Sequence, residues 1–445
     1  MRARQRGLWF ALLFLACGLF ALALPDGARA DLLDYVKKPE PHFAWKLKQK
    51  TENPFGVIYD LELTSQTWEG VDWTHSLQVY QPRGVAPTDV MLLYNTGGKP
   101  NEGTIAYGMI VAKKVGAPCA FLYDIPNQPL LGGKKEDALI AETFVRYLDT
   151  KDNDWPLLFP MTKSLVKAMD ALQAFSKEEW KAEVKGFVVS GASKRGWTTW
   201  LTGAADPRVR AIAPMVIDTL NMVEQMKHQK ETLGHYSDMI HDYTERGLVP
   251  IPDTDAARQL WKMIDPYFYR ARLTMPKLII CGANDQYWST DALNLYWDGL
   301  PGDKWVTYVP NAGHKLEQGG GGDAPGDRSV AVNALAAFAR AQVMGKAFPK
   351  LEWKHDDDAG RMRLTVTAKP APTAARLWVA KAPTRDFRNA KWEERPATID
   401  EETVTGEVDA PTDGCTAFFG DLDYEIDGIK YHLCTQMRVA GKAKP

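Results

Sequence analysis

Ser193 lies in a short glycine-flanked segment whose residue types could support nucleophilic chemistry. The segment 191–196 reads GASKRG; it follows the apolar run Gly186–Val189 and leads into a helix-compatible stretch. A serine on a tight turn between a strand and a helix is how the α/β-hydrolases expose their nucleophile. The turn is strained and crowded, which favours glycine on both sides. Arg195 stands where the common G-x-S-x-G pattern has its second glycine, so the motif alone leaves an ordinary strand-to-helix turn open.

Two other residues, which lie about a hundred positions later in the chain, could activate this serine. A hydroxyl is a weak nucleophile at neutral pH, so it needs a base, and the base needs an orienting partner. Asp285 and His314 each follow an apolar run, in the chain order Ser, Asp, His of the α/β-hydrolases. An aspartate there would accept the imidazole N–H and stabilise the imidazolium. Asp218, at the end of the preceding apolar run, is the alternative acid.

An acyl-transfer reaction also needs donors for the oxyanion of its intermediate. The backbone N–H of Lys194, directly after the nucleophile, is one candidate. The loop with Gly97 and Gly98 follows another apolar run and could offer N–H groups; its alternative is an ordinary turn. The side chains of Lys194 and Arg195 are either surface cations or groups that steer an anionic substrate.

The elements that would position these residues alternate between strands and helices. Residues 56–82 alternate between polar and apolar types and predict an antiparallel start to a sheet. Apolar runs without alternation follow, which fits strands buried on both faces of a parallel sheet. These runs are Val90–Tyr94, Cys119–Tyr123, Gly186–Val189, Ala211–Ile217, Lys277–Cys281 and Trp305–Val309. The pattern predicts an α/β-hydrolase domain with a doubly wound sheet over residues 31–350.

A long aromatic-rich interval, residues 218–272, interrupts this rhythm. We expect it to form a cap over the carboxyl edge of the sheet, where ligands bind in this fold class. The alternative is a pair of ordinary helices packed on the core. Tyr236 and Tyr243 in this interval, together with Trp197 after the serine, are the candidate substrate contacts.

The C-terminal part, residues 351–445, changes to alternating β-type patterns. Asp427-Gly428 between two such runs is a hairpin signal, and the segment predicts a small β-sandwich. Cys415 and Cys434 lie there and could form a disulfide, which the sequence leaves open. The sequence contains no His/Cys cluster typical of zinc, so we expect neither a metal nor a cofactor.

Residues 1–30 have the features of an export signal. Three arginines precede an apolar run, and Ala28-Arg29-Ala30 fits a cleavage site. The alternative, a membrane anchor, needs a longer apolar run. We therefore expect an exported protein, periplasmic or extracellular, with no stable membrane insertion after cleavage. The formal net charge of −2 lacks the basic excess of nucleic-acid-binding proteins.

Several long motifs resemble one known family. They are 188–200 (VVSGASKRGWTTW), 125–130 (IPNQPL), 154–156 (DWP) with 160–163 (PMTK), and 214–218 (PMVID). From about residue 35 to the end, the chain resembles the PhoPQ-activated pathogenicity-related proteins, which include the secreted autocrine proliferation repressor proteins of amoebae. The resemblance implies an exported protein with an α/β-hydrolase fold and a C-terminal β module, but no particular substrate. It implies that Ser193 is the elbow serine and that Asp285 and His314 fall at its partners' positions. The elbow is also locally similar to that of glucuronoyl esterases.

The first functional hypothesis is an exported serine hydrolase that cleaves an ester or peptide bond in a small-molecule or peptide substrate. The second is a non-catalytic secreted binding or signalling protein on the same scaffold, since a fold does not by itself determine a function. A third is binding of envelope glycans through aromatic residues of the cap and the C-terminal module.

Overall fold

The computed structural model describes residues 31–319, 326–358 and 360–442. The predicted export signal, residues 1–30, lies outside the described residues. The chain from Asp31 onward forms one compact unit. None of the helices in the described part is both long and apolar enough to cross a membrane.

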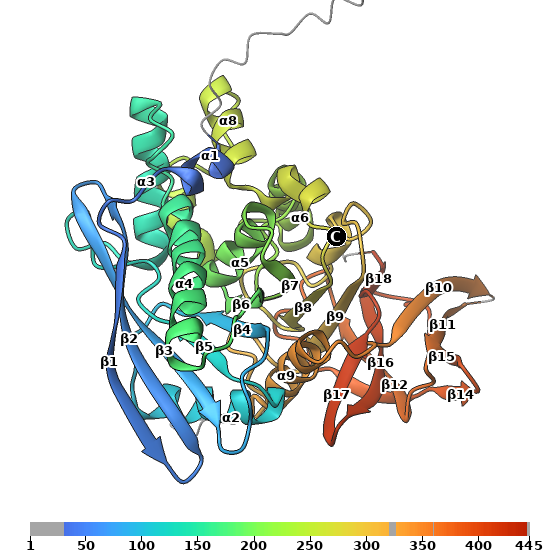
Figure 1. Ribbon diagram of the computed structural model, residues 1–445. Helices are drawn as coiled ribbons and strands as arrows, with labels where there is room; N and C mark the ends of the chain where they lie inside the picture. Colours follow the sequence, from blue (N-terminus) through green and yellow to red (C-terminus); the bar gives the residue numbers. More distant parts are fainter. Residues whose placement is uncertain (1–30, 320–325, 359, 443–445) are drawn as a thin grey trace, which may run out of the picture. The chain divides into compact units, whose positions relative to one another are not determined.

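A large mixed sheet runs through the molecule (Figure 1). Its strands lie in the order β1 (Ala44–Asn53), β2 (Gly56–Trp68), β3 (Val71–Pro82), β5 (Cys119–Leu122), β4 (Val90–Asn95), β6 (Gly186–Ala192), β7 (Val209–Met215), β8 (Lys277–Gly282), β9 (Lys304–Val309), β17 (Ile429–Cys434), β16 (Cys415–Ile426), β12 (Ala374–Ala382) and β13 (Glu393–Pro396), with β18 (Arg438–Gly441) beside β16. The first three strands are antiparallel, and β5 to β9 are parallel. The carboxyl ends of the parallel strands therefore meet at one edge.

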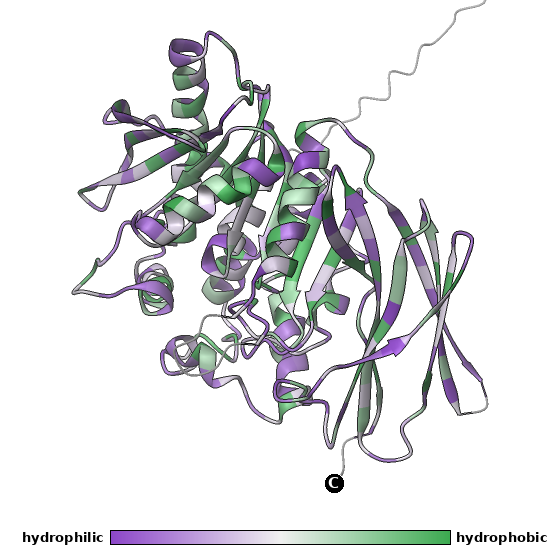
Figure 2. Ribbon diagram, turned by 90° about the horizontal axis from the view of Figure 1, so that it is seen from below, coloured by the Kyte–Doolittle hydropathy of each residue, from purple (hydrophilic) through white to green (hydrophobic). Residues whose placement is uncertain are grey.

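Helices cover both faces of the parallel strands, which gives two cores. One core includes α1 (Leu32–Lys37), α4 (Leu158–Glu179) and α5 (Lys194–Ala205), and the other includes α2 (Glu102–Val115) and α9 (Ser329–Val343). Successive strand residues point to opposite cores, as Leu92 and Leu93 do. Figure 2 shows the strands between these helices as largely hydrophobic. The predicted doubly wound α/β-hydrolase sheet is confirmed.

The interval after β7 is mostly helical. It contains α6 (Met222–Leu233), η1 (Asp238–Ile240), α7 (His241–Thr244), α8 (Asp255–Ile264) and η2 (Pro266–Arg272). A further helix, α3 (Glu136–Thr150), contacts α7 and α8. These elements follow the carboxyl ends of strands, so they lie where the sequence predicts a cap.

The C-terminal module is a β-sandwich, as predicted. Its outer sheet consists of β10 (Lys350–Asp358), β11 (Arg361–Lys369), β15 (Thr403–Asp409) and β14 (Thr398–Asp400). Its other sheet is a continuation of the central sheet, because Cys434 in β17 pairs with Val306 in β9. The sequence did not predict this join.

Cys415 and Cys434 do not form the disulfide that the sequence left open. Both are free thiols and buried. Cys434 pairs with Asp421 of β16, whereas Cys415 lies six residues earlier on that strand. Six residues of an extended strand span about 20 Å, and a disulfide needs Cα atoms within about 7 Å.

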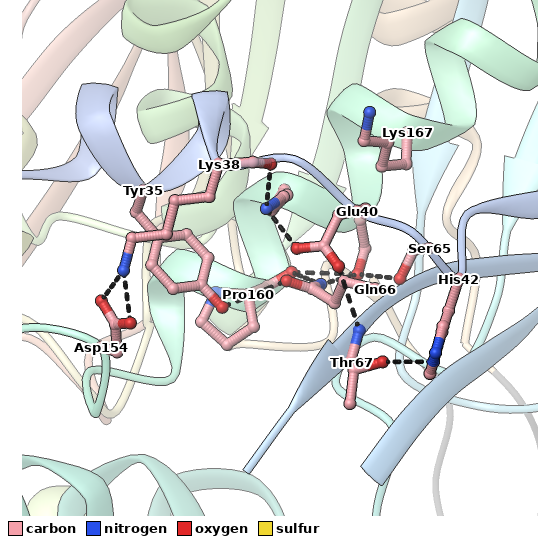
Figure 3. Close-up of polar contacts among 12 residues, drawn as sticks. Tyr35, Lys38, Glu40, His42, Ser65, Gln66, Thr67, Asp154, Pro160 and Lys167 are labelled. Carbon is pink, nitrogen blue, oxygen red and sulfur yellow. Dashed lines mark hydrogen bonds and ion pairs between the residues drawn. The ribbon is translucent and has the colours of Figure 1, made fainter. Parts of the chain in front are cut away.

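The segment after α1 is fastened to α4 by a polar network (Figure 3). The Lys163 ammonium, with 1% of its side chain exposed, pairs with Glu40 and donates to the Lys38 carbonyl at 2.8 Å. Gln66 donates to the Pro160 carbonyl at 2.7 Å. A buried charge is tolerated only when it is paired and hydrogen-bonded, so the Lys163 contacts hold the segment after α1 against α4.

Candidate active site

Ser193 occupies a strained turn between β6 and α5. Its backbone has φ 57° and ψ −127°, a conformation that non-glycine residues rarely adopt. The neighbouring glycines are required by space: a Cβ on Gly191 would lie 2.4 Å from Asn95 Nδ2, and one on Gly196 would lie 2.8 Å from the Met215 carbonyl. The turn therefore projects the serine at the carboxyl edge of the sheet.

Of the three residues proposed from sequence, His314 lies within hydrogen-bond reach of both Ser193 and Asp285. His314 Nε2 is 2.9 Å from Ser193 Oγ, and His314 Nδ1 is 2.8 Å from Asp285 Oδ2. The other carboxylate oxygen of Asp285 accepts the Tyr287 N–H at 2.9 Å. The Asp285 side chain is 8% exposed and that of His314 20%. This geometry matches a nucleophile, a base and an orienting acid.

Asp218, the alternative acid, has other partners. Tyr296 Oη donates to it at 2.5 Å, and Cys281 Sγ lies 3.9 Å away. Burial raises the pKa of Asp218 to about 7. The carboxylate that contacts His314 is therefore that of Asp285, and Asp218 is an internal acid of the same neighbourhood.

The candidate oxyanion donors lie in two places. Lys194 is the first residue of α5, so its N–H belongs to the helix end whose amides have no partner within the helix. The space beside Gly97 is filled by the Arg195 guanidinium, whose Nη2 would be 1.6 Å from a Cβ there. The Gly98 carbonyl accepts the Asp124 N–H at 3.1 Å. The oxyanion role of Gly97 and Gly98 stays a prediction.

Both cations after the serine are paired with carboxylates of α3. The Arg195 guanidinium holds Glu136 at 2.6 and 2.7 Å; burial would raise the pKa of Glu136, but the guanidinium lowers it to about 2. Lys194 Nζ lies 2.6 Å from Asp137; burial would lower the pKa of Lys194, but this carboxylate raises it. The sequence pattern did not point to Glu136 and Asp137, because nothing local marks a helix 57 to 59 residues upstream as a partner. Each pair of one cation and one carboxylate has no net charge, so the two cations produce little electrostatic field that could steer an anionic substrate.

A narrow cavity of about 40 Å³ opens beside Ser193 and His314. Trp197 and Tyr243, two of the candidate substrate contacts, line it, whereas Tyr236 is not among the lining residues. Most other walls are apolar and come from the interval after β7: Ile217, Met222, Met226, Ile240, Val249 and Trp261. That interval therefore covers the serine, as a cap would.

The C-terminal module contacts both loops that carry the serine's partners. Asn284, next to Asp285, donates to the carbonyls of Phe387 and Ala390 at 3.0 and 2.8 Å. Asn311, in the loop of His314, exchanges two hydrogen bonds with the backbone of Trp392, at 3.0 and 2.8 Å. One segment of the module, residues 387–392, thus holds both loops.

Comparison with known proteins identifies the family. The family model described as PhoPQ-activated pathogenicity-related protein matches residues 32–388. The chain belongs to this family. One relative, autocrine proliferation repressor protein A of Dictyostelium discoideum, is 34% identical over 382 residues, which cover 80% of this chain and 75% of the relative.

Solved structures with a similar fold include esterases. Acetyl xylan esterase 1 from a Thermoanaerobacterium species has a TM-score of 0.46 and 18% identity, over 64% of this chain and 86% of the esterase. Est1E from Butyrivibrio proteoclasticus has a TM-score of 0.39 and 14% identity, over 62% of this chain and 97% of Est1E. None of these comparisons identifies functional residues in this chain.

Proposed function

We propose that this member of the PhoPQ-activated pathogenicity-related family is an exported serine hydrolase of the acyl-transfer type. The observation that carries the proposal is the hydrogen-bonded chain from Ser193 Oγ through His314 to Asp285. It is supported by the strained turn at Ser193 and by the cavity that adjoins the serine hydroxyl. The export part of the proposal rests on the leader-like residues 1–30.

The chemistry follows from the roles of these three side chains. Ser193 Oγ attacks the carbonyl carbon of an ester or peptide while His314 Nε2 takes its proton. The tetrahedral intermediate is stabilised by backbone N–H groups, with that of Lys194 the first candidate. His314 then gives the proton to the leaving group, which departs and leaves an acyl group on Ser193. Water, deprotonated by His314, releases the acid and restores the serine.

Labelling by a fluorophosphonate tests this proposal directly. We expect the purified protein to be labelled at Ser193, because only an activated serine reacts readily with such a probe. The Ser193→Ala variant should lose all labelling, and Ser329→Ala, a control at an exposed serine of α9, should keep it. A folded protein that resists labelling would contradict the hydrolase proposal.

A non-catalytic role is the second candidate, and the name of the relative in Dictyostelium discoideum favours it, since it describes a repressor of proliferation. A protein that acts only by binding keeps its biological effect without a reactive serine. The growth of the producing organism with Ser193→Ala protein in place of the intact protein therefore separates the two candidates.

The export part of the proposal has its own test. Mass spectrometry of the mature N-terminus should find Asp31 as the first residue.

A further inference from the structure

Two residues that line the cavity beside Ser193 carry buried polar groups with no partner in the described part of the chain. They are the hydroxyl of Thr219 and the indole N–H of Trp288. Thr219 is 2% exposed and Trp288 is 6% exposed. Leaving a buried donor without an acceptor is costly, and most buried polar groups in proteins are satisfied.

Other polar groups of the cavity wall do have partners. The Trp197 N–H donates to the Ile264 carbonyl at 2.7 Å, and the Tyr243 hydroxyl donates to Asp137 at 3.0 Å. The contrast matters because those groups are satisfied within the protein, whereas the groups of Thr219 and Trp288 have no partner in the described residues.

Both residues lie on or beside the elements that carry the reacting residues. Thr219 follows β7, the strand next to β6, which ends just before Ser193. Trp288 lies in the loop after β8, three residues beyond Asp285. A group bound between them would therefore lie at the same edge of the sheet as Ser193, in the cavity that Ser193 also lines.

The size and charge of the cavity restrict what it can hold. Its volume of about 40 Å³ is well below the roughly 150 Å³ of an engineered cavity that holds benzene. Lys194 and Asp137, the charged residues on its wall, pair with each other at 2.6 Å. A short, uncharged group fits these limits, and a charged one would lose its hydration without gaining a counter-charge.

We propose that this cavity is the acyl subsite, and that it takes a short, uncharged acyl group bearing an oxygen acceptor, such as a hydroxyacyl or alkoxyacyl group. The oxygen accepts hydrogen bonds from Thr219 and Trp288, while the apolar walls contact the carbon atoms. This assignment rests on the proposed serine-hydrolase function. A site that satisfies its donors through the substrate discriminates against an analogue that lacks the acceptor.

A matched pair of esters tests the subsite. Umbelliferyl methoxyacetate and umbelliferyl butyrate carry acyl chains of equal length that differ by one oxygen in place of a methylene. The ratio of their kcat/KM values is measured for the intact protein, Thr219→Val and Trp288→Phe, since comparing variants cancels the intrinsic reactivity of the esters. We expect this ratio to fall about tenfold in each variant. Met226→Leu, a change of shape in the same wall, should alter it by less than about twofold.

The outcomes separate the subsite from the hydrolase. If Ser193 reacts with the fluorophosphonate but Thr219→Val leaves the ratio unchanged, the subsite proposal is wrong and the hydrolase proposal is retained. If Ser193 does not react, both are wrong. If Ser193 reacts with the fluorophosphonate but neither ester is cleaved, two boronic acids replace the esters. Methoxymethylboronic acid and n-propylboronic acid carry the same two chains, and the ratio of the concentrations at which they block labelling is compared among the same variants. Thr219→Val is nearly isosteric, so it decides the matter even if Trp288→Phe fails to fold.

Discussion

At the scale of single residues, two carboxyl groups near the serine differ in what they contact. The Asp285 carboxylate is hydrogen-bonded to the imidazole of His314, with Oδ2 2.8 Å from Nδ1. Asp218 is buried, with 6% of its surface exposed, accepts a hydrogen bond from Tyr296, and has a pKa raised to about 7 by burial. A carboxyl group whose pKa is about 7 is partly protonated at neutral pH, so it cannot stabilise an imidazolium as a fully ionised carboxylate does. We therefore infer that Asp285, and not Asp218, is the orienting acid of the proposed hydrolase.

Replacing each acid by its amide distinguishes them. Asp285→Asn should slow the reaction of Ser193 with a fluorophosphonate by about 10³-fold or more, because the amide no longer fixes the imidazole tautomer or stabilises its cation. Asp218→Asn should slow it by less than about tenfold at pH 6, where the native group is largely protonated and the amide resembles it. The rate constant of labelling, followed by gel fluorescence, is the measurement. Equal losses in the two variants would assign a shared role to the acids.

At the scale of elements, the loops after β8 and β9 depend on a distant part of the chain. Asn284 and Asn311 bond to the backbone of residues 387–392 in the C-terminal module. Phe387 and Trp392 in that segment are both 1% exposed, so the segment is itself fixed by packing. We infer that the module acts on the site through these two loops.

Asn311→Ala tests this positioning role. It removes both hydrogen bonds to Trp392, so we expect His314 to lose its fixed position and the labelling of Ser193 to slow by about tenfold. Gln436→Ala is the matched control, because it also breaks a contact between the module and the rest of the chain, the 2.8 Å bond to Asn294 in η3 (Ala292–Leu295), away from the residues next to Asp285 and His314. Thermal melts of the two variants show whether stability changes alike. A slower reaction in both, in proportion to lost stability, would mean that the module only stabilises the fold.

The sequence predicts the strand-following residues of the site better than their surroundings. Ser193, Asp285 and His314 were found because each follows an apolar run, and parallel strands bring such positions to one edge. Glu136 and Asp137 could not be found this way, since they lie on a helix whose position depends on tertiary packing. The pairing of β9 with β17 was missed for a similar reason: 120 or more residues separate the two strands, and no local pattern specifies such a register.

At the scale of the whole molecule, the join between the central sheet and the module carries a charged cluster. His432 in β17 lies 2.7 Å from Asp423 and 3.4 Å from Asp421, and Arg376 Nη1 lies 3.1 Å from Asp421. The two acids and the histidine are also the types that bind metals. Here Arg376 contacts both carboxylates, which makes an ion-pair network the better description. Burial would lower the pKa of His432, but the two carboxylates raise it to about 9.

This shift predicts a pH dependence of stability. Because the folded pKa of His432 lies above the unfolded value of about 6.5, the protonated histidine stabilises the fold fully below pH 6.5, and the contribution is lost as the pH rises to about 9. His432→Gln should therefore lower the free energy of unfolding by on the order of 2 kcal/mol at pH 6 and by much less at pH 9.5. Urea unfolding at both pH values measures this. Leu433→Ala, a buried apolar neighbour that does not titrate, should destabilise about equally at both. A His432→Gln effect as large at pH 9.5 as at pH 6 would mean that the histidine acts by packing and not by charge.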